Sequence, residues 1–326
     1  MNTLIVAHQY YPVLGGVPVV ARLLANGFLR SNVAVRLVTA TRTPNHESDP
    51  FLVYRNPHPL LRLELFGWAD QIVMIGPSVR SGWPTFFSRK PCVISHQAGL
   101  PSGWLQWALV RRARNIACSQ YLASAIGRDV VAVPNPFDSS TFRICASVTK
   151  DREFIFVGRL VRDKGVDVLL RALANLHSRG MKARMSVVGA GHEEQKLKQL
   201  ALDLDIGDSV DFTGALHGAE LAAMIQSHHI GIVPSRWQEP FGIVALELIA
   251  SGIPIIVSRV GGLPEAAGPC GLLFDNEDYQ DLSRKMERLL LDRRLQVKLL
   301  SRTKAHLAPS SPENAAMSYL RVLASR

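Results

Sequence analysis

The sequence is poor in cysteine, with four in 326 residues. These four are widely spaced and form no C-x-x-C pair, which argues against a zinc site and against a disulfide framework. A reducing compartment such as the cytosol is therefore expected. The cysteines are Cys92, Cys118, Cys145 and Cys270.

Long apolar runs are also lacking. The longest apolar stretch, residues 243–257, is interrupted by Glu247 and Pro254, whereas a bilayer span needs roughly 20 apolar residues. The chain begins at Met1 and runs directly into an apolar segment at 3–7 without a basic leader, so no secretory signal is expected. We therefore expect a cytoplasmic protein, which leaves room for a peripheral position on the inner face of the plasma membrane.

Acidic residues are scarce in the first half of the chain. Residues 1–150 hold 15 Lys and Arg against 6 Asp and Glu, whereas the remainder holds 22 against 21. The net charge of +10 therefore belongs almost entirely to the first half. An anionic acceptor, a lipid phosphate or a membrane surface accounts for this asymmetry as well as nucleic acid does, and a merely soluble basic face is the simplest alternative.

The apolar pattern repeats one architecture twice. Short runs rich in Val and Ile alternate with amphipathic helical stretches, first from residue 3 and again from residue 153, which is typical of βαβ units. We expect an α/β protein with two Rossmann-like, doubly wound parallel-sheet domains facing each other across a cleft. Residues 1–145 form the acceptor-side domain and 146–311 the donor-binding domain. Ser311 and Pro312 predict the start of a final helix, 312–326, that packs back on the first domain.

The segment 234–247 carries the most informative junction. A strand ends there, a polar turn follows, and Pro240 precedes a helix. The first amides of a helix lack internal partners and lie at the positive end of its dipole. Amides around Gly242, Ile243 and Val244 are therefore candidates to bind a phosphate or sugar oxygen.

Two carboxylates accompany this junction, Glu239 in the turn and Glu247 eight residues later. Carboxylates accept hydrogen bonds from vicinal hydroxyls. Alone, each residue also fits an N-terminal helix glutamate or a helix-surface glutamate. Glu247, however, lies among apolar residues on a helix that is apolar nearly all round, where an unpaired carboxylate is costly.

Two cations follow the strand that opens the second half. Arg159 and Lys164 leave from its carboxyl end, where ligands of open α/β sheets bind. Two cations near a helix start suit a diphosphate, both when it is bound and when it leaves with increasing charge. The alternative is a surface loop with incidental basic residues.

Together these segments resemble a known family. Across residues 150–265 the chain is similar to the retaining GT-B glycosyltransferases of the large family (glycosyl transferases group 1) that contains sucrose synthases and bacterial lipopolysaccharide and phosphatidylinositol sugar transferases. The matching segments are V-G-R-L and K-G at 157–165, V-G-A-G-H-E at 188–193, F-T-G at 212–214, P-S and E-P-F-G-I-V with the later Glu at 234–247, G-I-P at 252–254 and V-G-G-L-P-E at 260–265.

The resemblance implies a role for each matching residue. Arg159 and Lys164 grip the donor diphosphate, and Glu239 holds the transferred sugar together with the amides from Phe241 to Val244. Glu247 binds the ribose. The expected reaction is hexosyl transfer, with retention, from a nucleotide-diphosphate sugar to an acceptor hydroxyl in bacterial glycolipid, polysaccharide or glycoconjugate synthesis.

The first half matches the family at fewer positions. Gly15 and Gly16 resemble its glycine loop after the first strand, and Asn135 begins a segment similar to its interdomain N-G-[VF]-D motif, with Pro136 in place of the glycine. His96 matches a position near the transferred sugar, although a histidine at a strand end is also commonly structural. The chain between 43 and 71 is short for the family.

No cofactor and no metal are expected, because Arg159, Lys164 and the helix amides can neutralise the diphosphate. The nucleotide sugar is a co-substrate, and the acceptor is a sugar or a lipid-linked molecule. Two other functions stay open: a nucleotide-sugar 2-epimerase on the same scaffold, and a non-enzymatic nucleic-acid binder that uses the basic first domain. The second-half motifs favour the transferase, so no nucleic acid is expected as a partner.

One basic and aromatic stretch, 103–114, has two interpretations. It contains Trp104 and Trp107 together with the arginines Arg111, Arg112 and Arg114. This composition suits an anionic membrane interface. It equally suits an ordinary packed helix with a basic end.

Overall fold

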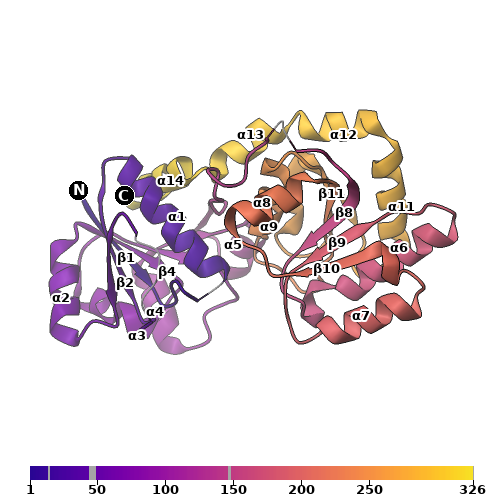
Figure 1. Ribbon diagram of the computed structural model, residues 1–326. Helices are drawn as coiled ribbons and strands as arrows, with labels where there is room; N and C mark the ends of the chain where they lie inside the picture. The colour runs from indigo at the N-terminus through magenta and orange to yellow at the C-terminus, as the bar shows by residue number, and fades with distance from the viewer. Residues whose placement is uncertain (14, 44–48, 146–147, 326) are drawn as a thin grey trace. The chain divides into compact units, whose positions relative to one another are not determined.

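The computed structural model describes residues 1–13, 15–43, 49–145 and 148–325. The chain separates into two compact units (Figure 1). Unit 1 consists of residues 1–137 and 309–326, and unit 2 of residues 138–308. Each unit is built on one parallel β-sheet, which confirms the predicted fold class of two doubly wound sheets.

The sheet of unit 1 has seven parallel strands in the order β3-β2-β1-β4-β5-β6-β7. The strands β2 and β3 lie on one side of β1, and the later strands β4 to β7 lie on its other side. The strand order therefore reverses between β1 and β4. In open α/β sheets such a switch point creates a crevice at the carboxyl ends of the strands. The strands are β1 (Asn2–Ala7), β2 (Ala34–Thr39), β3 (Leu52–Arg55), β4 (Gln71–Ile75), β5 (Cys92–His96), β6 (Arg114–Ala117) and β7 (Val130–Ala132).

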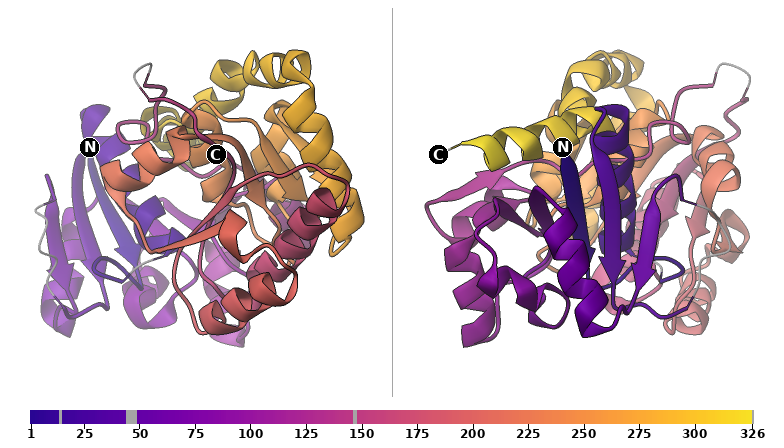
Figure 2. Two further views of the ribbon diagram at one scale, coloured as in Figure 1. Left: turned by 45° about the vertical axis from the view of Figure 1, so that its right-hand side comes forward. Right: turned by 90° about the vertical axis from the view of Figure 1, so that its left-hand side faces the viewer.

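The helices of unit 1 cover both faces of its sheet. The helices α1 (Gly16–Arg30) and α14 (Pro312–Ala324) pack against each other. Residues of α2 (Pro59–Trp68) and α4 (Trp104–Arg112) share an apolar core with the sheet. The views in Figure 1 and Figure 2 show α1 and α14 on the face opposite to α2, α3 (Val79–Gly82) and α4. A 3-10 turn (Trp83–Phe87) and α5 (Gln120–Ile126) complete the unit.

The helix α14 joins the end of the chain to the first unit. Ser311 Oγ accepts a hydrogen bond from the Asn314 amide at 3.2 Å, so the serine caps the helix that Pro312 starts. Tyr319 is buried and its hydroxyl lies 2.5 Å from Ser95 Oγ on β5. A Cβ added to Gly27 of α1 would lie 2.1 Å from the Pro312 carbonyl oxygen, which shows how closely the two helices approach.

The sheet of unit 2 has six parallel strands in the order β10-β9-β8-β11-β12-β13. Its order reverses between β8 and β11, which are hydrogen-bonded neighbours with Phe154 opposite Ile230. The switch point of this unit therefore lies at the carboxyl ends of those two strands. The strands are β8 (Arg152–Val157), β9 (Met185–Val188), β10 (Val210–Gly214), β11 (His228–Val233), β12 (Ile255–Ser258) and β13 (Gly271–Phe274).

Two layers of helices enclose this second sheet. One layer shares a single apolar core with the strands and contains α6 (Val166–Ser178), α7 (Glu194–Asp203) and α11 (Tyr279–Leu291). After β10 the chain crosses to the other side of β8, and right-handed crossovers then place the connecting helices on the face opposite to α6 and α7. These are α8 (Gly218–Gln226), α9 (Ile243–Ala250) and α10 (Leu263–Ala267). The helices α12 (Arg293–Leu300) and α13 (Thr303–Leu307) lead back to unit 1.

The strands of both sheets read as continuous apolar runs because they are buried on both faces. Four of the six residues in β11 and three of the four in β12 are apolar or glycine and buried: Ile230, Gly231, Ile232, Val233, Ile255, Ile256 and Val257. Ser258 is the polar residue of β12. Among the described residues, no helix has both the length and the apolar character needed to cross a membrane.

Candidate active site

Three loops meet at the switch point of unit 2, one each from the carboxyl ends of β8, β11 and β12. Gly165 has φ +66°, and a Cβ there would lie 2.1 Å from the carbonyl oxygen of Pro234. Gly261 has φ +54°, and a Cβ there would lie 2.2 Å from the carbonyl oxygen of Glu239. Only glycine satisfies both the backbone angle and the close approach at these two positions. The three loops are therefore held in direct backbone contact.

The polar centre of these loops is an ion pair between Lys164 and Glu239. Lys164 Nζ donates to Glu239 Oε1, and Ser235 Oγ donates to the same oxygen at 2.6 Å. Both charged side chains are mostly buried, with exposed fractions of 19% for Lys164 and 12% for Glu239. The carboxylate is thus oriented from two sides while its Oε2 has no hydrogen bond to another described residue, so this oxygen is available to a ligand.

Arg236 holds the β11 loop against the start of α6. Its guanidinium makes two parallel hydrogen bonds to the Asp167 carboxylate, at 2.8 and 2.7 Å. Its amide donates to the Asp163 carbonyl at 2.8 Å. Bidentate pairs of this kind fix geometry as well as charge. The pair therefore positions the loop that carries Glu239 relative to the loop that carries Lys164.

The first turn of α9 is open at its N-terminus. Gly242 has φ +104° and provides no side-chain cap, and a Cβ there would lie 2.5 Å from Leu263. The amides of Gly242, Ile243 and Val244 make no backbone hydrogen bond within the described part of the chain. Phe241 is buried, so only its backbone can face a ligand. The predicted anion-binding amides are thus present at the end of the β11 loop.

Glu247 lies one turn into α9 and is partly buried. Burial and, to a smaller extent, the negative charge of Asp138 together raise the pKa of this carboxyl to about 7. Asp138 itself accepts four hydrogen bonds from the backbone and hydroxyls of Ser140 and Thr141, which lower its pKa. Ser140 and Thr141 thereby keep Asp138 ionised, and Glu247 is the member of the pair that is poised to change protonation near neutral pH.

Arg159 follows β8 on the same edge of the sheet and is exposed. Its guanidinium makes no hydrogen bond or ion pair with any described residue. The adjacent turn is closed by glycines of the next loop: a Cβ on Gly189 would lie 1.8 Å from the Gly158 carbonyl oxygen. Arg159 therefore follows a closely packed turn as an exposed cation at the carboxyl edge of the sheet.

The predicted residues of unit 1 lie at two places on its sheet. Gly15 and Gly16 begin α1 after β1, which is one of the two strands at the switch point of this unit. In the loop region after β1, His8 Nδ1 lies 3.2 Å from Ser78 Oγ, which caps α3 after β4. Polar groups from both strands thus meet at the switch point of unit 1.

His96 and Asn135 are both buried in unit 1. His96 Nε2 lies 3.0 Å from Asn115 Oδ1 on β6, and burial lowers the pKa of its imidazole, so the ring is neutral at neutral pH. Asn135 Oδ1 has no hydrogen-bond partner among the described residues. The contact of His96 with Asn115 fixes its ring within the sheet, whereas Asn135 keeps one buried acceptor free.

The basic and aromatic stretch 103–114 does not form one uniform surface. Trp104 is 78% exposed, and Arg111 and Arg112 are exposed as well. Trp107, however, packs against the apolar core, and Arg114 donates to the Leu323 carbonyl of α14. Trp107 and Arg114 therefore serve packing within unit 1, which corrects the interpretation of the whole stretch as one face.

The sequence reasoning did not single out Ser235, Gly261 or Asp138. Ser235 orients Glu239, Gly261 contacts its backbone, and Asp138 raises the pKa of Glu247. Each lies in a segment that matched the family, at 134–138, 234–247 or 260–265. The family motifs therefore pointed to these segments. The contacts of the three residues could not be predicted, because they depend on strands that are distant in sequence.

Among the described residues, no group of three or more His, Cys, Asp or Glu side chains is placed so that it could hold a metal ion. The sequence holds one D-x-D triplet, Asp203-Leu204-Asp205, at the end of α7. Asp203 accepts a hydrogen bond from Gln199 at 2.8 Å within that helix. The triplet therefore lies at the end of α7 and not in the loops after β8, β11 and β12 that form the site.

Comparison with protein families matches residues 139–306 to the model described as glycosyl transferases group 1. This segment covers nearly all of unit 2. It includes every loop of the switch point described above.

Two curated proteins are similar to part of the chain. D-inositol 3-phosphate glycosyltransferase from Corynebacterium jeikeium is 38% identical over 165 residues, which are 48% of this chain and 39% of the relative. Glycogen synthase from Mycobacterium tuberculosis is 28% identical over 219 residues, 60% of this chain and 53% of the relative. The chain thus spans between about two fifths and half of the length of these relatives.

Two solved structures share the fold over the whole chain. Sucrose-phosphate synthase from Thermosynechococcus elongatus superposes with a TM-score of 0.78 at 21% identity and covers 98% of both chains. Anabaena Alr3699/HepE in complex with UDP superposes with a TM-score of 0.80 at 20% identity and covers both chains fully. At this identity the likeness concerns the fold: both units have counterparts in these structures.

Proposed function

The chain belongs to the glycosyl transferases group 1 family, and we propose that it transfers a sugar from a nucleotide-diphosphate sugar to an acceptor hydroxyl with retention of anomeric configuration. The observation that carries this proposal is the oriented pair of Lys164 and Glu239 at the switch point of unit 2, next to the open amides of α9. A cation, a carboxylate and helix amides in one place suit the diphosphate and the sugar of one donor.

The donor is proposed to lie on unit 2. Arg159 and Lys164 hold the two phosphates, and the amides of Gly242, Ile243 and Val244 complete the anion site. Relatives of the same fold have been solved with UDP and with UDP-glucose, which supports a nucleotide sugar as the ligand. In this arrangement Glu239 Oε2 accepts hydrogen bonds from hydroxyls of the transferred sugar.

Glu247 is the proposed partner of the ribose. An ionised carboxylate accepts hydrogen bonds from both vicinal hydroxyls, as the acidic residue of a dinucleotide-binding fold does. Its pKa of about 7 means that the bound ribose must stabilise the charged form. The donor thereby satisfies a carboxylate that has no hydrogen-bond partner among the described residues.

Bond cleavage is proposed to occur without a metal. As the glycosidic bond to the diphosphate breaks, negative charge grows on the leaving phosphate, and the cations with the α9 amides stabilise it. The leaving phosphate oxygen accepts the proton of the attacking hydroxyl on the same face of the sugar. The new bond therefore forms on the face from which the old bond broke, and the configuration is retained.

The acceptor is proposed to bind unit 1, which carries most of the net positive charge. A lipid-linked or otherwise anionic acceptor fits that charge, and it places the protein at the cytoplasmic face of a membrane in glycolipid or glycoconjugate synthesis. Gly15, Gly16, Asn135 and His96 line the carboxyl edge of that unit's sheet or the segment beyond it.

Thermal shift against a panel of nucleotide sugars, followed by NMR of the product made with candidate lipid acceptors, tests the proposal. We expect stabilisation by one donor and a product with the donor's anomeric configuration. An inverted product would overturn the retaining mechanism. Release of a free epimerised sugar without acceptor would instead identify a 2-epimerase, and the absence of stabilisation by every donor would remove the assignment.

A further inference from the structure

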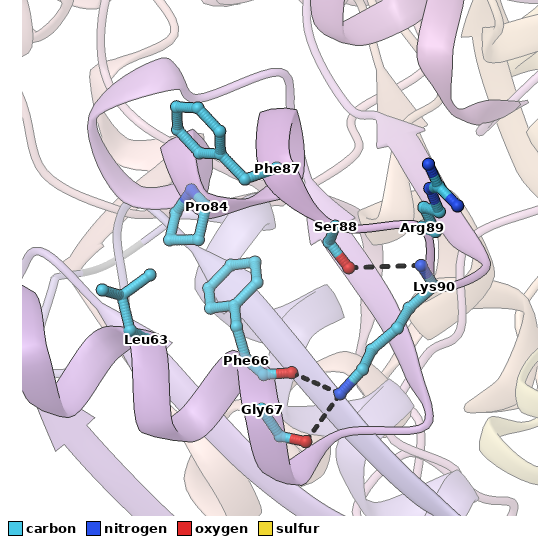
Figure 3. Close-up of a pocket in the computed structure, with 8 residues that line it drawn as sticks. All are labelled: Leu63, Phe66, Gly67, Pro84, Phe87, Ser88, Arg89 and Lys90. Carbon is cyan, nitrogen blue, oxygen red and sulfur yellow. Dashed lines mark hydrogen bonds between the residues drawn. The ribbon is translucent and has the colours of Figure 1, made fainter.

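Unit 1 contains an apolar pocket on its outer surface, away from the strand ends that carry the predicted site residues. The pocket has a volume of about 490 Å³ and lies between α2 and the 3-10 turn that precedes β5. Figure 3 shows the side chains of Leu63, Phe66, Pro84 and Phe87 around it, with Arg89 and Lys90 at one side.

The apolar residues at its mouth are unusually exposed. Phe87 is 80% exposed and Leu63 is 44% exposed, and Leu60, one turn earlier on α2, is 69% exposed. Their neighbours Phe66 and Phe86 point inward and pack on the sheet. The helix and the turn therefore already bury one apolar face. A second apolar face is turned to solvent, apart from an edge contact between the rings of Phe87 and Trp83.

The neighbouring helix α4 also carries exposed apolar side chains. The 3-10 turn packs against both α2 and α4, and all three belong to the layer over the same sheet core. On α4 the outward residues Trp104 and Leu105 are exposed as well. Exposed apolar surface around a pocket, as at Leu63 and Phe87, marks an interaction site. We call the set of Leu60, Leu63 and Phe87 the apolar face.

The charges around the apolar face are mainly positive. Arg89, Arg111 and Arg112 are exposed and make no ion pair with a described residue. Lys90 has another role, because its ammonium donates to the Phe66 and Gly67 carbonyls at 2.7 and 2.6 Å and so closes the end of α2 (Figure 3). Glu64 is the only acidic residue in the sequence of α2.

We propose that the apolar face docks on the surface of an anionic phospholipid bilayer, with Phe87 and Leu63 among the acyl chains and Arg89 on the lipid phosphates. An aromatic and aliphatic surface with the unpaired Arg89 at its side is complementary to the headgroup boundary of such a membrane. A protein partner would not by itself require positive charge beside an apolar surface, whereas an anionic membrane does. This inference rests on the proposed function, because docking on the bilayer would hold the enzyme beside a lipid-linked acceptor.

Vesicle flotation with the full chain tests this proposal. The probes are vesicles of phosphatidylcholine alone and of phosphatidylcholine with phosphatidylglycerol. We expect binding to the anionic vesicles, about tenfold weaker partitioning for the double variant Leu63→Ser with Phe87→Ser, and about fivefold weaker partitioning for Arg89→Gln. Leu291→Ser on α11, which removes an apolar side chain that is 68% exposed in unit 2, and Arg294→Gln are matched controls and should bind as the wild type does.

Two outcomes overturn the proposal: equal binding by the wild type and the Leu63 and Phe87 variant, or a dimer of the wild type in light scattering that this variant dissociates. The second outcome would assign the apolar face to a second copy of the chain. Donor-induced thermal shift, measured in the same variants without vesicles, keeps the two proposals separate. An intact donor shift with lost flotation supports both proposals, whereas a missing donor shift in the wild type removes the proposed function and leaves the flotation result to decide the docking surface.

Discussion

Lys164 and Glu239 are 75 residues apart in the sequence, yet their side chains form an ion pair where β8 and β11 end side by side. The pair exists because the strand order of unit 2 reverses at this point, so the loops after the two strands face each other. Ser235 and Gly261 then fix the carboxylate and its backbone. Glu239 is thus oriented by groups of the protein itself, which is the condition for electrostatic stabilisation of a leaving diphosphate.

Glu239→Gln should reduce turnover strongly and leave the fold intact. The amide keeps the shape of the side chain but removes the charge that Lys164 and the sugar hydroxyls require, and loss of one such stabilising group costs about 10²–10³ in kcat. Steady-state kinetics together with circular dichroism would measure both effects. Glu194→Gln, which removes the more exposed ion pair with Lys198 on α7, is the matched control and should keep wild-type turnover.

The stability of the unliganded protein should fall as pH rises toward neutrality. The pKa of Glu247 is raised from 4.5 to about 7, so its contribution is fully present below pH 4.5 and is lost as pH rises through 7. A shift of this size corresponds to about 3 kcal/mol in the free energy of unfolding. Glu247→Gln should therefore be more stable than the wild type at pH 8 and similar to it at pH 5 in urea unfolding. Equal pH dependence in both proteins would contradict this assignment.

Donor affinity should show the opposite dependence on pH. Ribose hydroxyls donate to the ionised form of Glu247, so binding below pH 7 requires the carboxyl to lose its proton. We expect about tenfold weaker binding at pH 6 than at pH 8. Isothermal titration with the donor found by thermal shift would measure it. Glu247→Gln should bind weakly and equally at both pH values, and a wild-type affinity in this variant would show that the ribose lies elsewhere.

Gly261→Ala should impair both stability and donor binding. The new Cβ would lie 2.2 Å from the Glu239 carbonyl oxygen at a residue with φ +54°, so the β11 loop must move. We expect a loss of about 2–4 kcal/mol in the free energy of unfolding. Gly103→Ala has no atom within 4 Å of its added Cβ and is the control. Denaturant unfolding and donor titration of the two variants, compared with the wild type, would decide.

Transfer should proceed in the presence of EDTA. Arg159, Lys164 and the amides of α9 supply the positive charge that a divalent ion would otherwise provide to the diphosphate. Initial rates with EDTA and with added manganese should agree within about twofold, since no step depends on the ion. Abolished transfer in EDTA that manganese restores would show that a metal takes part.

The sequence was sufficient for the two sheets and for most of their strands. Buried parallel strands such as β2, β4 and β11 are apolar runs that are bounded by loops, and this pattern is local. The strands β3 and β13 do not show this pattern. Both are four residues long and lie at the edges of their sheets, and Leu52 in β3 is exposed, so neither shows a run of buried apolar residues.

The helix α2 was also missed, and here the reason is its composition. Its sequence is apolar on several sides, because Leu65 and Phe66 pack inward while Leu60 and Leu63 face solvent. No 3.6-residue periodicity is visible in such a segment. His58, whose Nδ1 accepts from the Leu61 amide at 3.3 Å, caps the helix, but histidine is not a common N-cap residue.

The residues of the site were predicted individually, but their contacts were not. Arg159, Lys164 and Glu239 were found through motifs and their position at strand ends. The pairing of Lys164 with Glu239 and of His96 with Asn115 depends on which strands are neighbours, and strand order is a property of the whole sheet. Periodicity and spacing carry no information on it.

The discontinuity of unit 1 has a consequence for biosynthesis. Because α14 supplies Tyr319 to the sheet and packs on α1, the first unit lacks part of its core until residues 309–326 leave the ribosome. Unit 2 is contiguous in the chain and can complete its folding earlier. During translation, the apolar side of α1 that Pro312 and Ala316 later cover stays open and is a natural point of attachment for chaperones.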